Sequence, residues 1–174
     1  PMDLQVDPRN PDRVFVNNYT GGNLLSEDGG RTWQLASRGY TGANLHDIAV
    51  DPVDGRRVFT IGRSGVFRSD DGGATWMGLN YVPQNMRGWF TVYGPMGEWY
   101  AVSADPHNPG RVLFADEMWG ALLLSADNGR DWKVVFRHPD VSSIYGRRHG
   151  FKALAFAPSS ASVVYAGMSA DRAR

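Results

Sequence analysis

The sequence contains no cysteine among its 174 residues, so disulfides and thiolate metal sites are excluded and the redox compartment stays undetermined. No apolar run approaches the roughly 18–20 residues that a helix needs to span a bilayer. Lysine plus arginine and aspartate plus glutamate both number 18, which gives a formal net charge of zero. This balance provides no electrostatic reason to expect a nucleic acid or an anionic membrane as a partner.

The chain also lacks a basic-then-apolar leader, so no signal peptide is expected in this segment. A start at Pro1 and a stop inside a repeat favour a piece of a longer protein. No H-x-x-x-H spacing occurs, so no metal site and no cofactor is predicted; the histidines are His46, His107, His138 and His149. Turn formers, by contrast, are abundant: 21 glycines and 10 prolines predict frequent turns and no long helices.

One short motif occurs three times, as SEDGGRTW at 26–33, SDDGGATW at 69–76 and SADNGRDW at 125–132. The shared frame is S-x-D-x-G-x-x-W, and we call each copy a box. Each box follows an Asp-Pro dipeptide at a nearly constant distance, whereas the distance from one box to the next Asp-Pro varies widely. A fourth unit begins as LAFAPSSASVVYAG and has no box. Constant interiors joined by variable connections indicate a structural module that carries adjustable loops.

Each unit reads as four short strands. In the second unit these are HDIAV, RRVFTI, GVFRS and a strand entered at TW, with Gly, Asp, Asn and Pro between them. Four strands every ~40–45 residues are typical of a propeller blade, and closed propellers have roughly 4–8 blades. We therefore predict an all-β fold, a β-propeller of four-stranded antiparallel blades with about three and a half blades present. The expected ranges are about 1–38, 44–80 and 97–137 for three blades and about 151–174 for an incomplete fourth.

The box falls where the third strand of a unit must reverse into the fourth. Glycine at its fifth position permits a positive φ, aspartate accepts backbone N–H bonds across the turn, and serine adds a second polar cap. The tryptophan then starts the outer strand and can bury its ring between neighbouring blades. A structural role is therefore assigned to Ser26, Asp28, Gly30, Trp33, Ser69, Asp71, Gly73, Trp76, Ser125, Asp127, Gly129 and Trp132.

The repeated S-x-D-x-G-x-x-W frame resembles the Asp-box (BNR) repeat of sialidase-like propellers. The segments AVDPVDGRRVF and GVFRSDDGGATW are similar to bacterial Asp-box proteins of the xyloglucanase and sortilin type. The resemblance covers essentially the whole chain and implies structural boxes that lie away from the catalytic centre. It also favours a secreted or periplasmic location. The family includes sialidases, xyloglucan hydrolases, sortilin-like receptors and photosystem assembly factors, so the fold alone does not determine the function.

In such a blade, the first-to-second and third-to-fourth turns share one face of the disc, which we call the box face. The second-to-third loops and the connections between blades share the opposite face, which we call the loop face. All of the variation in length lies on the loop face. Ligand sites tend to lie on variable loops held by a rigid scaffold. The loop face is therefore the candidate site.

Loop-face residues suit a carbohydrate, because aromatic rings stack on the apolar face of a pyranose and arginine forks grip carboxylates. The candidate substrate-binding residues are Trp119, Trp99, Trp89, Tyr81, Tyr145, Arg147, Arg148 and His149. The candidate catalytic carboxylates are Asp116, Glu117, Glu98 and Asp140. The alternative for each ring is that it packs a long loop onto the disc. For the charged residues, the alternatives are solvated loop carboxylates and arginines paired with local acids.

Two functions follow from these residues. The first is a glycoside hydrolase-like propeller that acts on or binds a poly- or oligosaccharide. The alternative is a non-catalytic propeller that binds a protein or peptide, as sortilin-like receptors and photosystem assembly factors do. No R-I-P-like arginine motif of the sialidases is present, no tyrosine nucleophile with a glutamate partner can be assigned, and no motif here transfers the aspartates of xyloglucan hydrolases. These departures support the alternative. The boxes, the bacterial-style blades and the aromatic loops with nearby carboxylates support the glycoside hydrolase-like propeller, which is the function that we predict.

Overall fold

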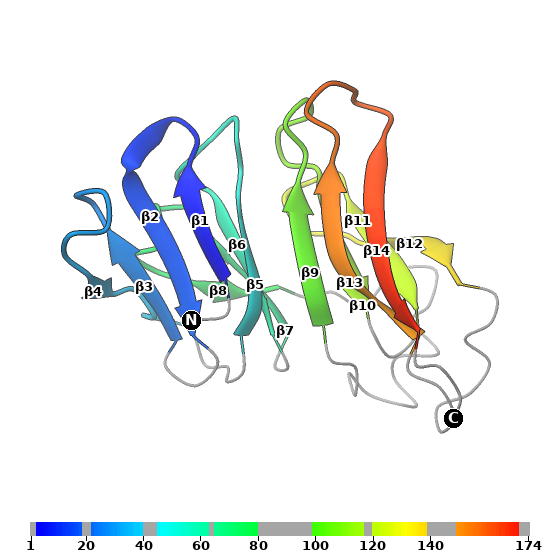
Figure 1. Cartoon of the computed structure of the whole chain (residues 1–174), viewed down its shortest axis with the longest axis horizontal. Coiled ribbons are helices and arrows are strands. Elements are labelled where there is room, and N and C mark those ends of the chain that lie inside the picture. Colours follow the sequence, from blue (N-terminus) through cyan, green and yellow to red (C-terminus); the bar gives the residue numbers. More distant parts are fainter. Residues whose placement is uncertain are drawn as a thin grey trace.

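The computed structural model describes residues 3–18, 22–39, 45–62, 65–79, 99–116, 120–138 and 149–170. These residues form fourteen strands in four antiparallel sheets (Figure 1). Within each sheet the strands follow one another in sequence order. In the part of the chain so described, no helix is long and apolar enough to cross a membrane.

Three sheets have four strands each and the last has two; we call them blades one to four. Blade one contains β1 (Asp3–Asp7), β2 (Asn10–Asn18), β3 (Gly22–Ser26) and β4 (Gln34–Leu35). Blade two contains β5 (Leu45–Val50), β6 (Val58–Gly62), β7 (Gly65–Ser69) and β8 (Met77–Gly78). Blade three contains β9 (Trp99–Ala104), β10 (Val112–Asp116), β11 (Ala121–Ser125) and β12 (Lys133–Arg137). Blade four contains β13 (His149–Phe156) and β14 (Val164–Ala170).

This architecture confirms the predicted all-β fold of four-stranded antiparallel blades with an incomplete fourth. The first strands of successive blades, β1, β5, β9 and β13, are neighbours in space. In blades one and two the outer strands, β4 and β8, have only two residues each. The Asp-Pro turns lie at the upper end of the strands in Figure 1, and the strand ends that belong to the loop face lie at the lower end.

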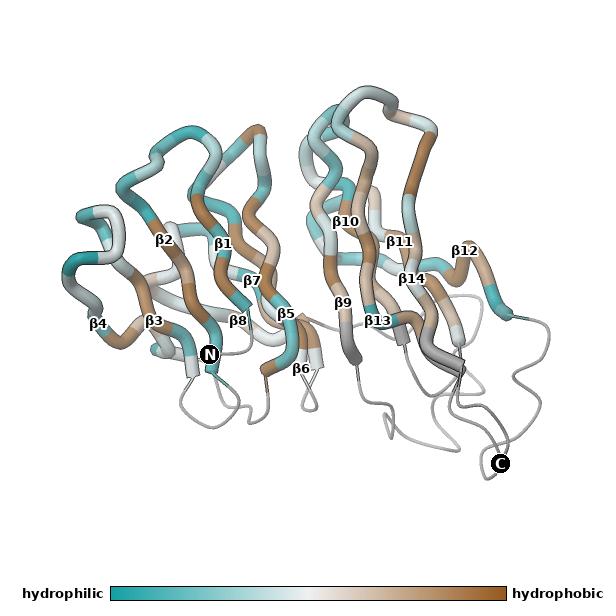
Figure 2. Tube along the Cα trace, viewed as in Figure 1, coloured by the Kyte–Doolittle hydropathy of each residue, from teal (hydrophilic) through white to brown (hydrophobic). Residues whose placement is uncertain are grey.

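The core consists of apolar layers between consecutive blades, which the brown strand segments of Figure 2 mark. Alternate residues of each strand face opposite neighbours, so one blade contributes to two layers. Ile48 and Val50 of β5 pack toward blade one, whereas Ala49 between them packs toward blade three. A third layer joins blades three and four through Leu113, Ala115, Leu122, Phe151 and Phe156. The fold is therefore stabilised by burial between blades.

The boxes form three nearly identical turns. In each, the serine hydroxyl donates to the aspartate at 2.8 Å and accepts the N–H of the following glycine at 2.8 Å. That glycine has a positive φ, 89° at Gly30 and 87° at Gly73, which other residues adopt only with strain. The indole N–H of the box tryptophan donates back to the carbonyl of this glycine. Serine, aspartate, glycine and tryptophan thus fix one another.

The box aspartates remain charged because the turn supplies hydrogen-bond donors. Hydrogen bonds from the side chain and backbone of Thr32 and from Ser26 lower the pKa of Asp28 to about 2. Burial alone would raise the pKa of Asp71, but hydrogen bonds from Thr75 and Ser69 outweigh it and lower this pKa. Asp131 replaces the threonine in the third box, and its N–H still donates to Asp127 at 3.0 Å.

The Asp-Pro turns carry a second repeated contact, an ion pair between the aspartate and an arginine six residues later. The nearest N–O distances are 3.8 Å for Arg13–Asp7, 3.2 Å for Arg57–Asp51 and 3.0 Å for Arg111–Asp105. In blade four both partners are absent, because Ala157 and Val163 occupy the two positions. The Ala157 N–H still donates to the Val163 carbonyl at 2.9 Å, so the turn itself is retained. Because aspartate and arginine are both absent from this turn, neither leaves an unpaired charge there.

The three box tryptophans differ in burial, depending on whether a described blade precedes their own. Trp76 is 5% exposed, and its indole N–H also donates to the Ala36 carbonyl of blade one at 2.6 Å. Trp132 is fully buried, in an apolar cluster that also contains Phe59 and Ile61 of blade two. Trp33 is 40% exposed, because it belongs to the first of the described blades. The ring therefore joins a blade to the one before it.

Replacing Trp76 with alanine is expected to lower the free energy of unfolding by about 3–5 kcal/mol, because it removes a buried ring and leaves a cavity. The same change at Trp33 is expected to cost less than about 2 kcal/mol, because that ring already contacts water. Urea unfolding followed by circular dichroism measures both. Equal losses at the two positions would contradict the inter-blade role of the ring.

The box carboxylates also predict an acid limit to stability. Their folded pKa values lie below the unfolded value, so the stability they provide is complete above about pH 4 and is lost as the pH falls through the folded pKa toward about 2. The melting temperature is expected to fall over this window. Asp71→Asn should reduce the melting temperature at pH 6 and flatten the acid slope, whereas Asp12→Asn at an exposed position should change neither. An unchanged acid slope in the Asp71→Asn variant would contradict this account.

Candidate functional site

The strand ends of the loop face carry three of the predicted site residues. Asp116 ends β10, and its register partner is Trp99 at the start of β9. His149 begins β13 opposite Ala170. The structure therefore brings a predicted carboxylate position next to a predicted aromatic position on neighbouring strands. The other nine predicted residues lie outside the described residues: Glu98, Glu117, Asp140, Trp89, Trp119, Tyr81, Tyr145, Arg147 and Arg148.

Because these residues are not described, the separation of the proposed carboxylates is not tested. The assignments of Asp116, Glu117, Glu98 and Asp140 as catalytic therefore stay predictions. The same holds for the aromatic and basic binding residues. Within the described ranges, no three histidine or acidic side chains lie close enough to hold a metal ion.

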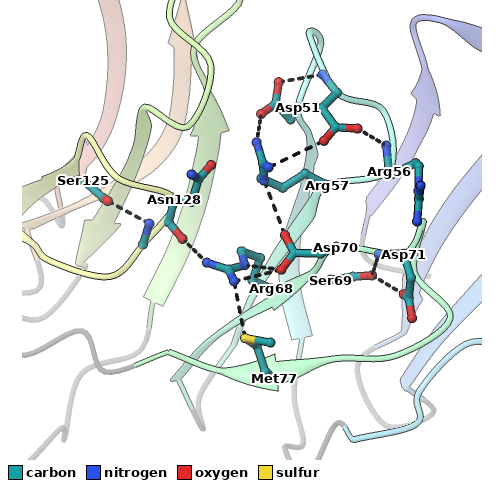
Figure 3. Close-up of polar contacts among 12 residues, drawn as sticks. Asp51, Arg56, Arg57, Arg68, Ser69, Asp70, Asp71, Met77, Ser125 and Asn128 are labelled. Atoms are coloured by element: carbon teal, nitrogen blue, oxygen red, sulfur yellow. Dashed lines mark hydrogen bonds and ion pairs between the residues drawn. The ribbon is translucent and has the colours of Figure 1, made fainter.

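The box face shows a charged network whose members satisfy one another (Figure 3). Arg57 contacts Asp51 at 3.2 Å, Asp54 at 3.5 Å and Asp70 at 3.4 Å. Arg68 contacts the same Asp70 at 2.8 Å. Paired charges of this kind leave little for a ligand to contact, which directs attention to the opposite face.

Arg68 also crosses from blade two to blade three. Its guanidinium donates to the Asn128 carbonyl at 2.6 Å. Asn128 lies in the third box and has a φ of 64°, which makes it the one positive-φ residue among the described ranges that is not glycine. Asparagine tolerates this conformation better than most residues. Arg68 therefore braces an irregular turn in the next blade, and the corresponding positions in blades one and three are Leu25 and Leu124.

A register row near the loop face differs in chemistry from blade to blade. The row is Asp3–Asn17–Asn23 in blade one, Asp47–Ile61–Val66 in blade two and Ala101–Ala115–Leu122 in blade three. Register partners project from the same side of a sheet, so each row faces the following blade. At the level of this row, the layer between blades one and two is therefore polar. The layer between blades two and three is less polar, and the layer between blades three and four is apolar.

The amides of this row are almost completely buried. Asn17 and Asn23 are 0% and 1% exposed. The Asn17 side-chain oxygen accepts the Asp3 N–H at 2.7 Å, but the Asn17 Nδ2 and both polar side-chain atoms of Asn23 have no hydrogen-bond partner among the described residues. Each unsatisfied buried polar atom costs about 1–3 kcal/mol. Of the three rows, only the row of blade one contains such unsatisfied side-chain atoms.

Asp47 is the most strongly perturbed acid that the structure describes. Its two carboxyl oxygens accept the Ile48 N–H at 2.9 Å and the Val102 N–H at 2.8 Å. Burial, followed by the contact with Asp3, raises the pKa of Asp47 to about 8. Asp47 is therefore mainly protonated at neutral pH, and its side-chain hydrogen bonds join β5 to β9.

Sequence reasoning missed Asp3 and Asp47. A signal was present, because both stand four residues before the aspartate of an Asp-Pro dipeptide and thus occupy the same place in successive repeats. Asp47 also interrupts an otherwise apolar strand. Neither fact reveals that Asp3 helps to raise the pKa of Asp47, since their proximity depends on the packing of β1 against β5.

Comparison with known proteins gives two groups of relatives. A xyloglucanase of Paenibacillus sp is 37% identical over 98 residues, which cover 46% of this chain and 10% of that protein. The oligoxyloglucan-reducing end-specific xyloglucanase of Emericella nidulans is 26% identical over 150 residues, which cover 78% of this chain and 18% of that protein. The chain thus spans less than a fifth of the length of either relative. No protein-family model matches the chain.

Solved structures agree on the fold. The crystal structure of an ancestral GH74 enzyme superposes with a TM-score of 0.74 at 17% identity, over 95% of this chain and 21% of that one. The structure of YCF48 bound to D1 peptide superposes with a TM-score of 0.58 at 16% identity, over 76% of this chain and 40% of that one. The chain is a relative of the GH74 xyloglucanase-like and YCF48-like β-propellers built from BNR-type repeats, and it corresponds to part of such a propeller.

Proposed function

We propose that this chain is part of a carbohydrate-active propeller that hydrolyses or binds a poly- or oligosaccharide at its loop face. The observation that carries the proposal is the sequence similarity to xyloglucanases, which extends over 78% of the chain in the Emericella nidulans enzyme. The fold alone would not distinguish an enzyme from a binding protein. Similarity in sequence to several enzymes of one substrate class favours the enzyme.

The strand ends at the loop face have the chemistry that a glycosidase needs. Asp116 and Trp99 are register partners, which puts a carboxylate position beside an aromatic position. Together with Glu98, Glu117 and Asp140, Asp116 would supply the two carboxyl groups of the reaction. One gives its proton to the glycosidic oxygen, and the other activates water across about 6.5–9.5 Å or attacks the sugar directly when the two are about 5–5.5 Å apart.

The remaining candidates would hold the sugar. Rings at Trp99, Trp89, Trp119, Tyr81 and Tyr145 would stack on pyranose faces, and Arg147, Arg148 and His149 would bind polar or carboxylate groups at the rim. With binding and catalysis both on the loop face, the box face would have a purely structural role, which agrees with its internally paired charges.

A second candidate is a non-catalytic propeller that binds a protein or peptide. The similarity to YCF48 bound to D1 peptide favours it, because that structure shows a propeller of this kind in complex with a peptide. Its loop face would then bind an extended chain through the same aromatic residues and would have no need of two catalytic carboxyl groups.

The full-length protein is expected to release reducing sugars from a polysaccharide panel that includes xyloglucan. Asp116→Asn should lower kcat about 100-fold or more while sugar binding persists, because removing a catalytic carboxyl costs about 10²–10⁴ in rate. The matched control is Asp12→Asn, which changes an exposed aspartate near the box-face end of β2 and should retain full activity. Sugar binding without hydrolysis in the unaltered protein would contradict the enzymatic part of the proposal. Failure to bind any saccharide, together with binding of extended peptides, would establish the second candidate instead.

A further inference from the structure

Blade one presents an apolar face that no described blade covers. One row across its four strands faces away from blade two, and its members are Leu4, Val16, Leu24 and Leu35. Leu35 is 78% exposed and Leu4 is 52% exposed, although no member of the row carries a polar side chain. Blade one lies at the left end of the described blades in Figure 1. We call this row, together with Val6 and Trp33, the outward face.

The same positions are buried in the next blade. Val6 stands directly before the aspartate of its Asp-Pro dipeptide, as Val50 does in blade two. Val6 is 46% exposed, whereas Val50 is 9% exposed because it packs against blade one. Leu4 corresponds in the same way to Ile48, which is 1% exposed. The outward face therefore has the chemistry of a layer between blades and lacks a described blade to cover it.

The box tryptophans show what such a face contacts on the blade before it. The Trp76 indole N–H donates to the carbonyl of Ala36, which directly follows the outer strand β4. Leu79 directly follows the outer strand β8 and packs against the cluster that contains Trp132. Each buried ring therefore lies near the end of the preceding blade's outer strand. The Trp33 ring is 40% exposed, and its indole N–H donates within its own box.

Blade four is the one described blade whose following side is also open. Tyr165 on that side is 64% exposed and holds the position that Phe59 fills in the layer between blades two and three. A second copy of the chain could therefore bring its blade four to the outward face. However, blade four has two described strands, β13 and β14, and among them no outer-strand end for Trp33 to contact. The outward face therefore fits a complete four-stranded blade.

We propose that the outward face of blade one docks a further, complete four-stranded blade of the same polypeptide. The carbonyl that follows the outer strand of that blade accepts the Trp33 indole N–H, as the Ala36 carbonyl does for Trp76. That blade also presents a large apolar side chain to the face, at the position that Phe15 and Phe59 hold in the described layers.

The length of the related proteins supports the same polypeptide as the source of this blade. The match to this chain covers 18% of the Emericella nidulans xyloglucanase and 21% of the ancestral GH74 enzyme. A blade tethered in one polypeptide also meets the face at a high effective concentration. The docking does not depend on which ligand the loop face binds.

Thiol labelling of the full-length protein tests the docking, because the 174 residues contain no cysteine of their own. Val6→Cys is compared with Val50→Cys at the same place in blade two and with Asp12→Cys at an exposed position of β2. Val6→Cys should react with a maleimide at least about 100-fold more slowly than Asp12→Cys and at a rate close to that of Val50→Cys. The unaltered protein gives the background from any other cysteine. A Val6→Cys thiol that reacts as fast as Asp12→Cys would overturn the proposal.

Leu35→Cys repeats the measurement at the outer edge of the same face and keeps the test decisive if Val6→Cys does not fold. Its thiol should also be protected in the full-length protein, although Leu35 is 78% exposed in the described chain. An accessible Leu35→Cys beside a protected Val6→Cys would confine the contact to the inner strands and overturn the docking of a complete blade.

Dilution distinguishes the further blade from a second copy. Protection within one polypeptide should be the same at about 100 µM and at about 1 µM protein, whereas protection by a second copy should fall by mass action. Loss of protection on dilution, together with a halving of the mass in sedimentation, would assign the face to a second copy and overturn the proposal.

The box tryptophans give an independent readout. Within the 174 residues the Trp33 ring contacts water, so its removal costs less than that of Trp76. In the full-length protein, where the further blade buries the ring, Trp33→Ala and Trp76→Ala should lower the melting temperature by similar amounts. A Trp33→Ala variant that melts like the unaltered full-length protein would overturn the proposal.

Discussion

Burial of one sheet against the next is the constraint on which the rest of this structure depends. A four-stranded blade has two apolar faces and can bury them only against other blades. Ile48 and Val50 face backward, Ala49 faces forward, and the box tryptophan reaches back onto the preceding blade. The boxes and Asp-Pro turns serve this arrangement by fixing where each strand reverses. Their internal hydrogen bonds and ion pairs hold the turns in place.

This rigid face determines where variation is possible. The charges of the box face are used in contacts between Asp51, Asp70, Arg57 and Arg68, and one arginine braces the next blade. The segments that join the strands at the other end differ in length from blade to blade. The proposed saccharide site and the buried polar row of blade one both lie toward that end. The proposed function and the departures from strict repetition thus share one end of the strands.

Much of the fold was predictable from the sequence because it is local and repeated. The box fixes a hairpin within eight residues, and Asp-Pro stops a strand, so each blade could be predicted from its own segment. The arginine six residues after each Asp-Pro aspartate could also have been found, since Ala157 and Val163 replace both members together. The proximity of Asp3 to Asp47 could not be predicted, because it depends on how two blades pack and not on either segment alone. The candidate catalytic residues stay predictions for a similar reason: their chemistry follows from the sequence, but their convergence depends on loops outside the described residues.

The central claim is that ligands bind at the loop face, near the strand ends of β9 and β10, and that the boxes have no part in binding. A crystal structure of the full-length protein with a xyloglucan oligosaccharide tests it most directly. The account predicts sugar density beside Asp116 and Trp99, with a pyranose ring stacked on an aromatic side chain. Sugar density on the box face, against the Asp51–Arg57–Asp70 network, would contradict it.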